Sequence, residues 1–272
     1  MRSNTKSGRC DVCKEPVAVG AGFLIGPHGG WSLLCLSHKP TPPERINPGA
    51  WTNPGLASFD LETTGVSPIR DRIVSAGFIT DGDVETELLM NPGIPIPEAA
   101  ARVHGITDAD VADAIEAAEG VAIVTSWIVD AISRSIPVVV FNAPYDLTML
   151  RAEIERYGLQ QPNWEDLLVV DPLVIDWGIE KGRLGASKLN NVSEYYKVEL
   201  IDAHTAVADA RAARSVAYEM AARQPALQDV SFIKLMGLQK QWFAEKTEDW
   251  NQWASKQPNR RVGDPQGWPL AR

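Results

Sequence analysis

The alternation of apolar and polar positions first becomes regular near residue 57. Three runs rich in β-branched and aromatic residues, 57–61, 72–80 and 84–90, predict β-strands joined by short turns. The Asp-Gly-Asp sequence at 81–83, between the second and third runs, has the composition of a tight hairpin. We therefore expect a sheet that begins with antiparallel strands.

Helices and strands alternate after these runs. Helical spacing covers 113–133, a compact β-branched run occupies 136–141, and a second helical segment at 144–157 ends before Gly158. This order predicts a strand, a crossover helix and another strand. Residues 169–175 are expected to add one more short strand, so the sheet should be mixed.

The last third of the chain has helical periodicity. A short helix is predicted over 187–196, and small apolar residues recur at helical spacing over 204–222, which permits close approach to a sheet. Residues 229–256 are also predicted to be helical, and the tryptophans of this segment are expected to pack against the core. These tryptophans are Trp242, Trp250 and Trp253.

Composition separates the chain into parts. Residues 39–54 are rich in proline and polar residues and are predicted to form a linker. The linker divides the chain into a small module at 1–38, a main domain at 55–224 and a helical extension at 225–272.

The overall composition is that of an ordinary globular protein, since 44% of the 272 residues are hydrophobic and 22% are charged. No apolar run approaches the ~20 residues that span a bilayer. The amino terminus also lacks the apolar stretch of a secretory signal. We expect a cytoplasmic protein without a membrane partner.

The net charge of −9 is unevenly distributed. Residues 51–228 hold 13 basic and 27 acidic side chains, whereas 1–50 and 229–272 are mildly basic. This distribution is poorly suited to coating a long nucleic-acid duplex. A negative net charge ordinarily argues against a nucleic-acid partner. It is tolerable for an enzyme that grips only a strand end through bound divalent cations, because the ions supply local positive charge.

Two acids stand at alternate positions of the first predicted strand. Asp60 and Glu62 leave the same face of that strand, where repulsion and desolvation raise carboxylate pKa values unless a cation lies between them. Paired hard oxygen ligands favour Mg²⁺ or Mn²⁺. Taken alone, a solvent-facing pair at a strand end is the simpler interpretation.

Two later segments add candidate ligands. Asp146 is expected in the first turn of a helix directly after a buried strand. His204 and Asp209 stand five residues apart at the start of an alanine-rich helix. Taken singly these residues are ordinary, because the helix dipole favours an acid at a helix start and a histidine can cap a helix there.

The three cysteines of the chain all lie in its first 38 residues. Cys10 and Cys13 form a Cys-x-x-Cys pair, and Cys35 and His38 repeat the same spacing with 21 residues between the two pairs. Two such knuckles match the ligands and spacing of a closed tetrahedral zinc site. A redox pair and free thiols are the alternatives. The sequence leaves open whether the module binds nucleic acid, docks a partner or only caps the fold.

Taken in order, the acidic segments resemble the DEDDh family of 3′→5′ exonucleases, which includes the proofreading epsilon subunits of bacterial replicative polymerases. The family's Asp-x-Glu-Thr-Thr-Gly segment stands at 60–65, Asn-Ala-x-Phe/Tyr-Asp at 142–146, and His-x₄-Asp at 204–209. A His-Gly-Ile-Thr segment at 104–107 is also similar. Phe141 departs from the family pattern, because many relatives have a histidine there.

The resemblance implies a ribonuclease H-like mixed β-sheet flanked by helices, here preceded by a small zinc-knuckle module with one structural Zn²⁺ and followed by a helical tail. It also implies phosphodiester hydrolysis with two Mg²⁺ or Mn²⁺ ions held by four carboxylates. The ligands would be Asp60, Glu62, Asp146 and Asp209, with His204 as the general base.

The same resemblance suggests where the substrate lies. The backbone around Thr63 and Thr64 and the side chains of His104 and Asn142 are expected to meet the terminal nucleotide. Leu61 is expected to wedge against the last base. For His104, a hydrogen-bonded structural role is an equal alternative.

We therefore predict a 3′→5′ exonuclease that releases 5′-mononucleotides from single-stranded or frayed 3′ ends, with DNA favoured and a role in proofreading or repair. An RNA-trimming relative and a non-catalytic binding module are the alternatives. A DNA polymerase or a sliding clamp is the candidate partner. Contact with such a partner is the alternative to core packing for the tryptophans of the C-terminal extension.

Overall fold

The computed structural model describes residues 2–25, 32–46, 50–53, 55–180, 188–201, 204–257 and 259–271. Within these residues, the main domain is built on six strands. They are β6 (Ala57–Thr63), β7 (Ile73–Ile79), β8 (Glu85–Asn91), β9 (Ile115–Glu116), β10 (Val138–Val139) and β11 (Val169–Val170).

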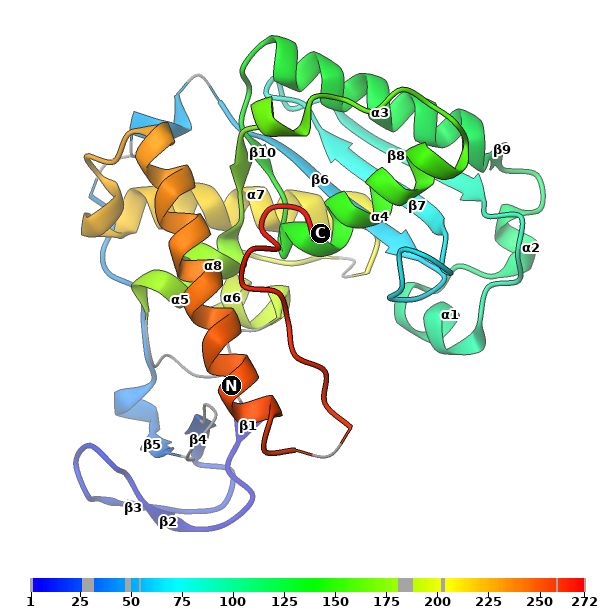
Figure 1. Cartoon of the computed structure of the whole chain (residues 1–272). Coiled ribbons are helices and arrows are strands. Elements are labelled where there is room, and N and C mark those ends of the chain that lie inside the picture. Colours follow the sequence, from blue (N-terminus) through cyan, green and yellow to red (C-terminus); the bar gives the residue numbers. More distant parts are fainter. Residues whose placement is uncertain are drawn as a thin grey trace.

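These strands form one sheet in the order β11-β10-β6-β7-β8-β9. Figure 1 shows β6, β7 and β8 side by side in this sheet. β6, β7 and β8 are antiparallel neighbours, whereas β10 is parallel to both β6 and β11. The predicted antiparallel start and mixed sheet are therefore confirmed. β7 is buried along its whole length, because helices cover both faces of the sheet.

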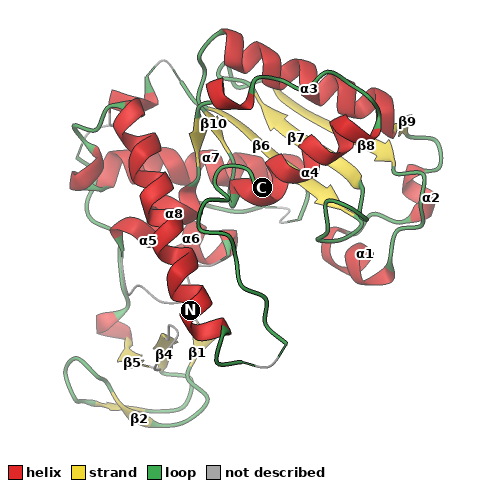
Figure 2. Cartoon of the chain, in the orientation of Figure 1, coloured by secondary structure: helices red, strands yellow, loops and turns green. Residues whose placement is uncertain are grey.

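Eight α-helices accompany the strands in the described residues (Figure 2). They are α1 (Glu98–His104), α2 (Asp108–Val111), α3 (Ala117–Ser133), α4 (Ala143–Arg156), α5 (Pro172–Ile179), α6 (Leu189–Tyr196), α7 (Ala206–Arg223) and α8 (Phe232–Ala254). α3 and α4 pack on one face of the sheet and α7 on the other.

Alternation along β6 assigns its side chains to these two faces. Phe59 and Leu61 belong to the same core cluster as Leu147 of α4 and Ile128 of α3. Because neighbouring strand residues point to opposite faces, Asp60 and Glu62 lie on the side of α7.

The strand predicted at 169–175 is shorter than expected. Only Val169–Val170 is extended, and α5 starts at Pro172. Asp171 caps this helix, since its carboxylate accepts hydrogen bonds from the backbone N–H groups of Leu173 and Val174, and proline is well suited to the first helical position. The short helices α1 and α2 were not predicted either.

The C-terminal extension packs on the main domain. The ring of Trp242 in α8 lies so close to Gly178 of α5 that no side chain fits at residue 178. Trp242 therefore packs against the core as predicted. Trp250 and Trp253 instead pack on each other, with ring centroids 4.8 Å apart. After α8 the chain runs beside α4, where Trp268 is buried.

The described part of the N-terminal module contains five short strands, paired as β1-β4-β5 and β2-β3. They are β1 (Arg2–Ser3), β2 (Gly8–Arg9), β3 (Pro16–Val17), β4 (Gly22–Ile25) and β5 (Ser32–Cys35).

The segment that follows this module lies on the main domain. Lys39 forms an ion pair with Glu194 at 2.8 Å, and the Tyr195 hydroxyl donates to the Thr41 carbonyl at 3.3 Å. The division at 38, 54 and 224 stays a prediction. Among the described residues, no helix combines the length and apolar character needed to cross a membrane.

Candidate active site

Three carboxylates from two distant segments of the sequence meet at the α7 face of the sheet. One carboxylate oxygen each of Asp60, Glu62 and Asp209 lies within 4.8 Å of the others. β6 supplies the first two and the first turn of α7 supplies the third. Oxygen ligands at this separation are suited to share a hard divalent cation.

Gly77 allows α7 to reach this position. In β7 it stands directly opposite Asp60, and a Cβ atom there would overlap the backbone of Ala206 and Val207. The first turn of α7 therefore rests on the bare backbone of β7. This close contact brings Asp209 to the two acids of β6.

Asp146 reaches the same place from α4. One of its carboxylate oxygens accepts the backbone N–H of Leu61 at 3.0 Å. Leu61 stands between Asp60 and Glu62, so this hydrogen bond fixes Asp146 beside the pair. Asp146 is only 3% exposed.

A buried acid orders the turn that precedes Asp146. Asn142 has a left-handed backbone with φ of 66° at the start of α4. The carboxylate of Asp171 accepts the N–H groups of Asn142 and Ala143 at 3.0 Å each. These bonds hold a backbone conformation that is otherwise costly for a residue other than glycine.

Burial and mutual repulsion make the cluster unfavourable for unbalanced negative charge. Burial raises the pKa of Asp60 and Asp146 well above the usual value, with further contributions from neighbouring carboxylates. It raises the pKa of Glu62 to about 8, helped by Asp209, and it also raises the pKa of Asp209. Divalent cations remove this penalty, so the donor set fits Mg²⁺ or Mn²⁺.

His204 lies at the mouth of the cluster, directly before α7. Its backbone N–H donates to a carboxylate oxygen of Asp209 at 3.3 Å, and its backbone is left-handed with φ of 74°. The side chain is exposed and lines the same cleft as the four acids. An imidazole in this position is accessible to water and lies beside the carboxylate cluster.

The cleft that contains these groups has a volume of about 430 Å³, which is the size of a small-molecule site. Beside the four carboxylates and His204, six other residues of the described part of the chain line it. They are Leu61, Phe141, Asn142, Tyr145, Leu173 and Lys246. The sequence pattern gave no indication of Leu173 or Lys246, because they enter the cleft from helices whose docking no local signal reveals.

The predicted substrate residues divide into two groups. Leu61 and Asn142 line the cleft, whereas Thr63, Thr64 and His104 do not. The Thr63 hydroxyl is 2.5 Å from the Tyr145 hydroxyl, and the Thr64 hydroxyl accepts the Arg72 backbone N–H at 2.9 Å. Both threonine side chains thus form hydrogen bonds within the protein.

His104 lies beside the cleft and is only 8% exposed. Its Nδ1 accepts the Ile106 N–H at 3.1 Å, whereas its Nε2 has no hydrogen-bond partner among the described residues. Burial lowers the pKa of His104, the nearby Thr63 backbone acts in the opposite direction, and the charge of His204 lowers it further. The substrate role of His104 remains a prediction.

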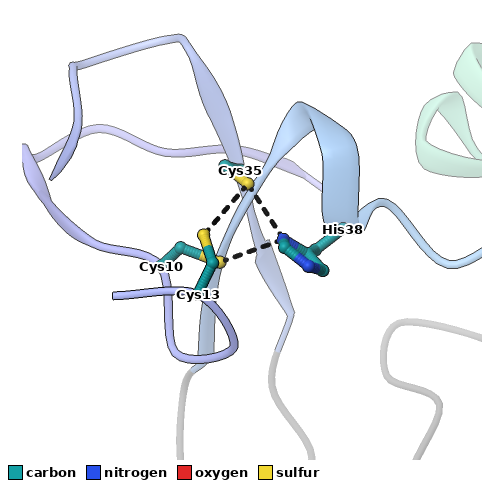
Figure 3. Close-up of side chains that lie close together, drawn as sticks. All are labelled: Cys10, Cys13, Cys35 and His38. Carbon is teal, nitrogen blue, oxygen red and sulfur yellow. Dashed lines mark hydrogen bonds between the residues drawn. The ribbon is translucent and has the colours of Figure 1, made fainter. Parts of the chain in front are cut away.

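The three cysteines and His38 form a second cluster in the N-terminal module (Figure 3). The Cys35 Sγ is 3.1 Å from the His38 Nδ1, the Cys10 Sγ is 3.7 Å from the same nitrogen, and the Cys13 and Cys35 Sγ atoms are 3.8 Å apart. Ligands bound to zinc at 2.0–2.3 Å in a tetrahedron lie roughly 3.5–3.8 Å from one another. The cluster therefore has the size of a zinc site.

The backbone around Cys10 favours its thiolate. Burial acts to raise the pKa of Cys10, but hydrogen bonds from the backbone near Cys13, Cys35 and Val12 outweigh it and lower the pKa to about 6. Thiolates are the form that binds zinc. A hydrogen bond from the Glu15 backbone lowers the pKa of Cys13, but burial and the neighbouring Cys10 and Cys35 outweigh it and raise that pKa. A cation among the sulfur atoms would favour the deprotonated form of both thiols.

Known proteins share the main domain. A family model described as Exonuclease, RNase_T, matches residues 58–217. The PolC-type DNA polymerase III of Caldanaerobacter subterraneus subsp. tengcongensis is 30% identical over 166 residues, which cover 60% of this chain and 11% of that protein. The PolC-type DNA polymerase III of Staphylococcus haemolyticus is 32% identical over 155 residues, 56% of this chain and 10% of that protein.

Solved structures share the fold. A structure of Exonuclease I is similar with a TM-score of 0.56 at 22% identity, covering 67% of this chain and 45% of that chain. E. coli Exonuclease I in complex with a dT13 oligonucleotide has a TM-score of 0.53 at 20% identity, covering 63% of this chain and 42% of that chain. The chain thus spans about a tenth of the curated relatives' length and less than half of Exonuclease I.

Proposed function

Because this chain belongs to the exonuclease family RNase_T, we propose that it is a 3′→5′ exonuclease that releases 5′-mononucleotides from the 3′ end of a single strand. The observation that carries the proposal is the meeting of Asp60, Glu62 and Asp209 within 4.8 Å, beside Asp146 and His204 in one cleft. A purely structural module has no need for a set of carboxylates whose burial is costly without cations.

The four carboxylates would hold two divalent cations. When bound, such ions activate the attacking water and stabilise the leaving 3′-oxygen. His204 is assigned as the general base, because its exposed imidazole lies at the cleft and can accept the proton of the water. Leu61, Phe141 and Leu173 give the cleft an apolar wall suited to the base and sugar of one nucleotide.

DNA is the proposed substrate. Relatives over the same domain are DNA polymerases, and one solved structure with this fold is in complex with an oligonucleotide of thymidine. We therefore assign a role in proofreading or repair, with a DNA polymerase or sliding clamp as the partner. RNA trimming is the alternative that the substrate test below decides.

We further propose that Cys10, Cys13, Cys35 and His38 hold one structural Zn²⁺. The distances between their sulfur and nitrogen atoms, 3.1 to 3.8 Å, support this assignment. So small a set of strands gains most of its stability from a bound metal.

Asp60→Asn and His204→Ala test the exonuclease directly. We expect each to lower mononucleotide release from a 3′-labelled single-stranded DNA in Mn²⁺ by about 100-fold or more. Glu155→Gln, an exposed acid on α4, is the control and should leave the rate unchanged. Matched DNA and RNA strands report the sugar preference. Full activity in both site variants would refute the proposal.

A further inference from the structure

Lys246 lies in the cleft, and the chemistry described above gives it no role. It is carried by α8 of the C-terminal extension and lines the same cleft as Asp60, Asp146 and His204. The sequence pattern around it shows only an ordinary helix. The docking of α8 on α5 is what brings this ammonium group to the carboxylates.

The position of Lys246 is held by contacts on the preceding turns of α8. Trp242, one turn earlier, packs directly on Gly178. The side chain of Gln239 accepts the Asp171 N–H at 2.6 Å and donates to the Val169 carbonyl at 2.9 Å. These contacts tie α8 to the end of β11. Lys246 therefore belongs to a fixed wall of the cleft.

Lys246 has no protein partner among the described residues. No carboxylate oxygen of a described residue lies within 4.0 Å of its Nζ, and Lys246 forms no side-chain hydrogen bond with a described residue. Burial lowers its pKa, and the negative charge of Asp171 acts in the opposite direction. Asp171 is itself already satisfied by several N–H donors. These are Asn142, Ala143, Leu173, Val174 and Trp268.

Charge balance indicates which kind of ligand Lys246 can bind. The four carboxylates carry four negative charges, and two divalent cations would neutralise them. The charge of the cleft-lining carboxylates is then balanced, and the negative charge closest in effect to Lys246 is that of Asp171, which contacts N–H groups and not the ammonium. A phosphodiester carries the single negative charge that complements it, and lysine binds phosphate as a point charge.

We propose that Lys246 binds a phosphate group of the substrate strand and so positions the 3′-terminal nucleotide in the cleft. This inference rests on the proposed exonuclease function and adds the C-terminal extension to the substrate-binding surface. The competing account is that Lys246 serves only as a distant counter-charge for Asp171. That account predicts an effect on stability and none that depends on the charge of the substrate.

The test uses the full chain, Lys246→Met, Lys246→Arg and the control Lys240→Met. Lys240 lies on the same helix and is exposed. The substrates are single-stranded oligodeoxythymidylates with either natural linkages or one neutral methylphosphonate at the first, second or third linkage from the 3′ end. Binding is followed by fluorescence anisotropy in Ca²⁺, mononucleotide release in Mn²⁺, and folding by thermal denaturation.

We expect Lys246→Met to weaken binding of the natural strand about 10- to 100-fold. Lys246→Arg should retain most of the affinity, and Lys240→Met should match the unaltered chain. One methylphosphonate position should weaken binding by the unaltered chain by a similar factor. A methylphosphonate at that position should not further weaken binding by Lys246→Met, because this variant already lacks the contact with the phosphate.

Two results would overturn the inference. One is that the methylphosphonate weakens binding by the unaltered chain and by Lys246→Met equally at all three linkages. The other is a lower melting temperature of Lys246→Met with unchanged affinity. Absence of mononucleotide release by the unaltered chain would instead refute the proposed function, and the binding measurements would still decide the role of Lys246.

Discussion

The backbone of Gly77 in β7 lies directly against the backbone of Val207 in α7, closer than any side chain at residue 77 would permit. Gly77 is also the strand partner of Asp60. One contact between bare backbones thus sets the distance between the acids of β6 and Asp209 at the start of α7. The geometry of the carboxylate cluster depends on it.

Gly77→Ala should therefore move Asp209 away from Asp60 and Glu62. A methyl group there pushes α7 from the sheet, and overpacking of this kind costs about 1–3 kcal/mol. We expect a larger effect on mononucleotide release, at least about 10-fold, because a displacement near 1 Å is enough to impair positioning. Chemical denaturation and the release assay measure the two effects.

Gly237→Ala is the matched control for this change. Gly237 lies in α8 with nothing within 4 Å of the position of a Cβ atom. Alanine should stabilise the helix there by up to about 1 kcal/mol. Activity should stay the same. Equal activity of Gly77→Ala and the unaltered chain would show that the close contact of α7 with β7 does not determine the geometry of the carboxylate cluster.

The stability of the metal-free protein should fall as the pH rises. Glu62 has a pKa of about 8 in the fold and 4.5 as an ordinary glutamate, so the folded state binds more protons between these values. By linkage, the free energy of unfolding decreases as the pH passes from about 5 to about 8. The raised pKa values of Asp60, Asp146 and Asp209 act in the same direction.

Thermal denaturation in EDTA across this pH range measures the effect. Mn²⁺ should stabilise the protein more at the higher pH, because the cation binds the deprotonated carboxylates. Glu62→Gln should flatten the dependence in EDTA. A melting temperature that rises with pH in EDTA for the unaltered chain would contradict the assignment of these pKa shifts.

Trp268 should support the active site from outside the main domain. Its indole N–H donates to Asp171 at 3.3 Å, and Asp171 holds the turn before Asp146. Trp268→Phe keeps the packing and removes this donor, so we expect a loss of about 1 kcal/mol in stability and a lower rate of release.

Trp250→Phe is the comparison for this variant. The Trp250 indole donates to the Arg261 carbonyl at an exposed site far along the sequence from the turn at Asn142. Its loss should leave the rate unchanged. The same decrease in rate for both variants would mean that the bond to Asp171 has no special role.

Cys35→Ser should empty the proposed zinc site. Elemental analysis of the purified chain is expected to give about one zinc per molecule, and the variant should have much less, because a closed site needs all four ligands. Asp60→Asn should keep its zinc. A chain purified without zinc, and unchanged in melting temperature by Cys35→Ser, would rule out a structural metal.

Local chemistry explains what was predictable about the fold. β-branched runs gave the strands of the mixed sheet, and helical spacing gave α3, α4, α7 and α8. The strand predicted beyond Val170 was wrong, because the capping side chain of Asp171 and the proline after it start a helix. A run of valine, leucine and isoleucine does not distinguish a buried strand from a buried helix.

The sequence by itself identified the candidate side chains for the chemistry, because paired acids, a histidine and spaced cysteines are recognisable without coordinates. It also placed Asp60 and Glu62 on one face of a strand, since side chains alternate along a strand. Only the tertiary structure decided that Gly77 admits α7, that Asp171 orders the turn before Asp146, and that α8 carries Lys246 into the cleft. Each of these depends on how separate elements dock, and docking is set by packing between residues that are distant along the chain.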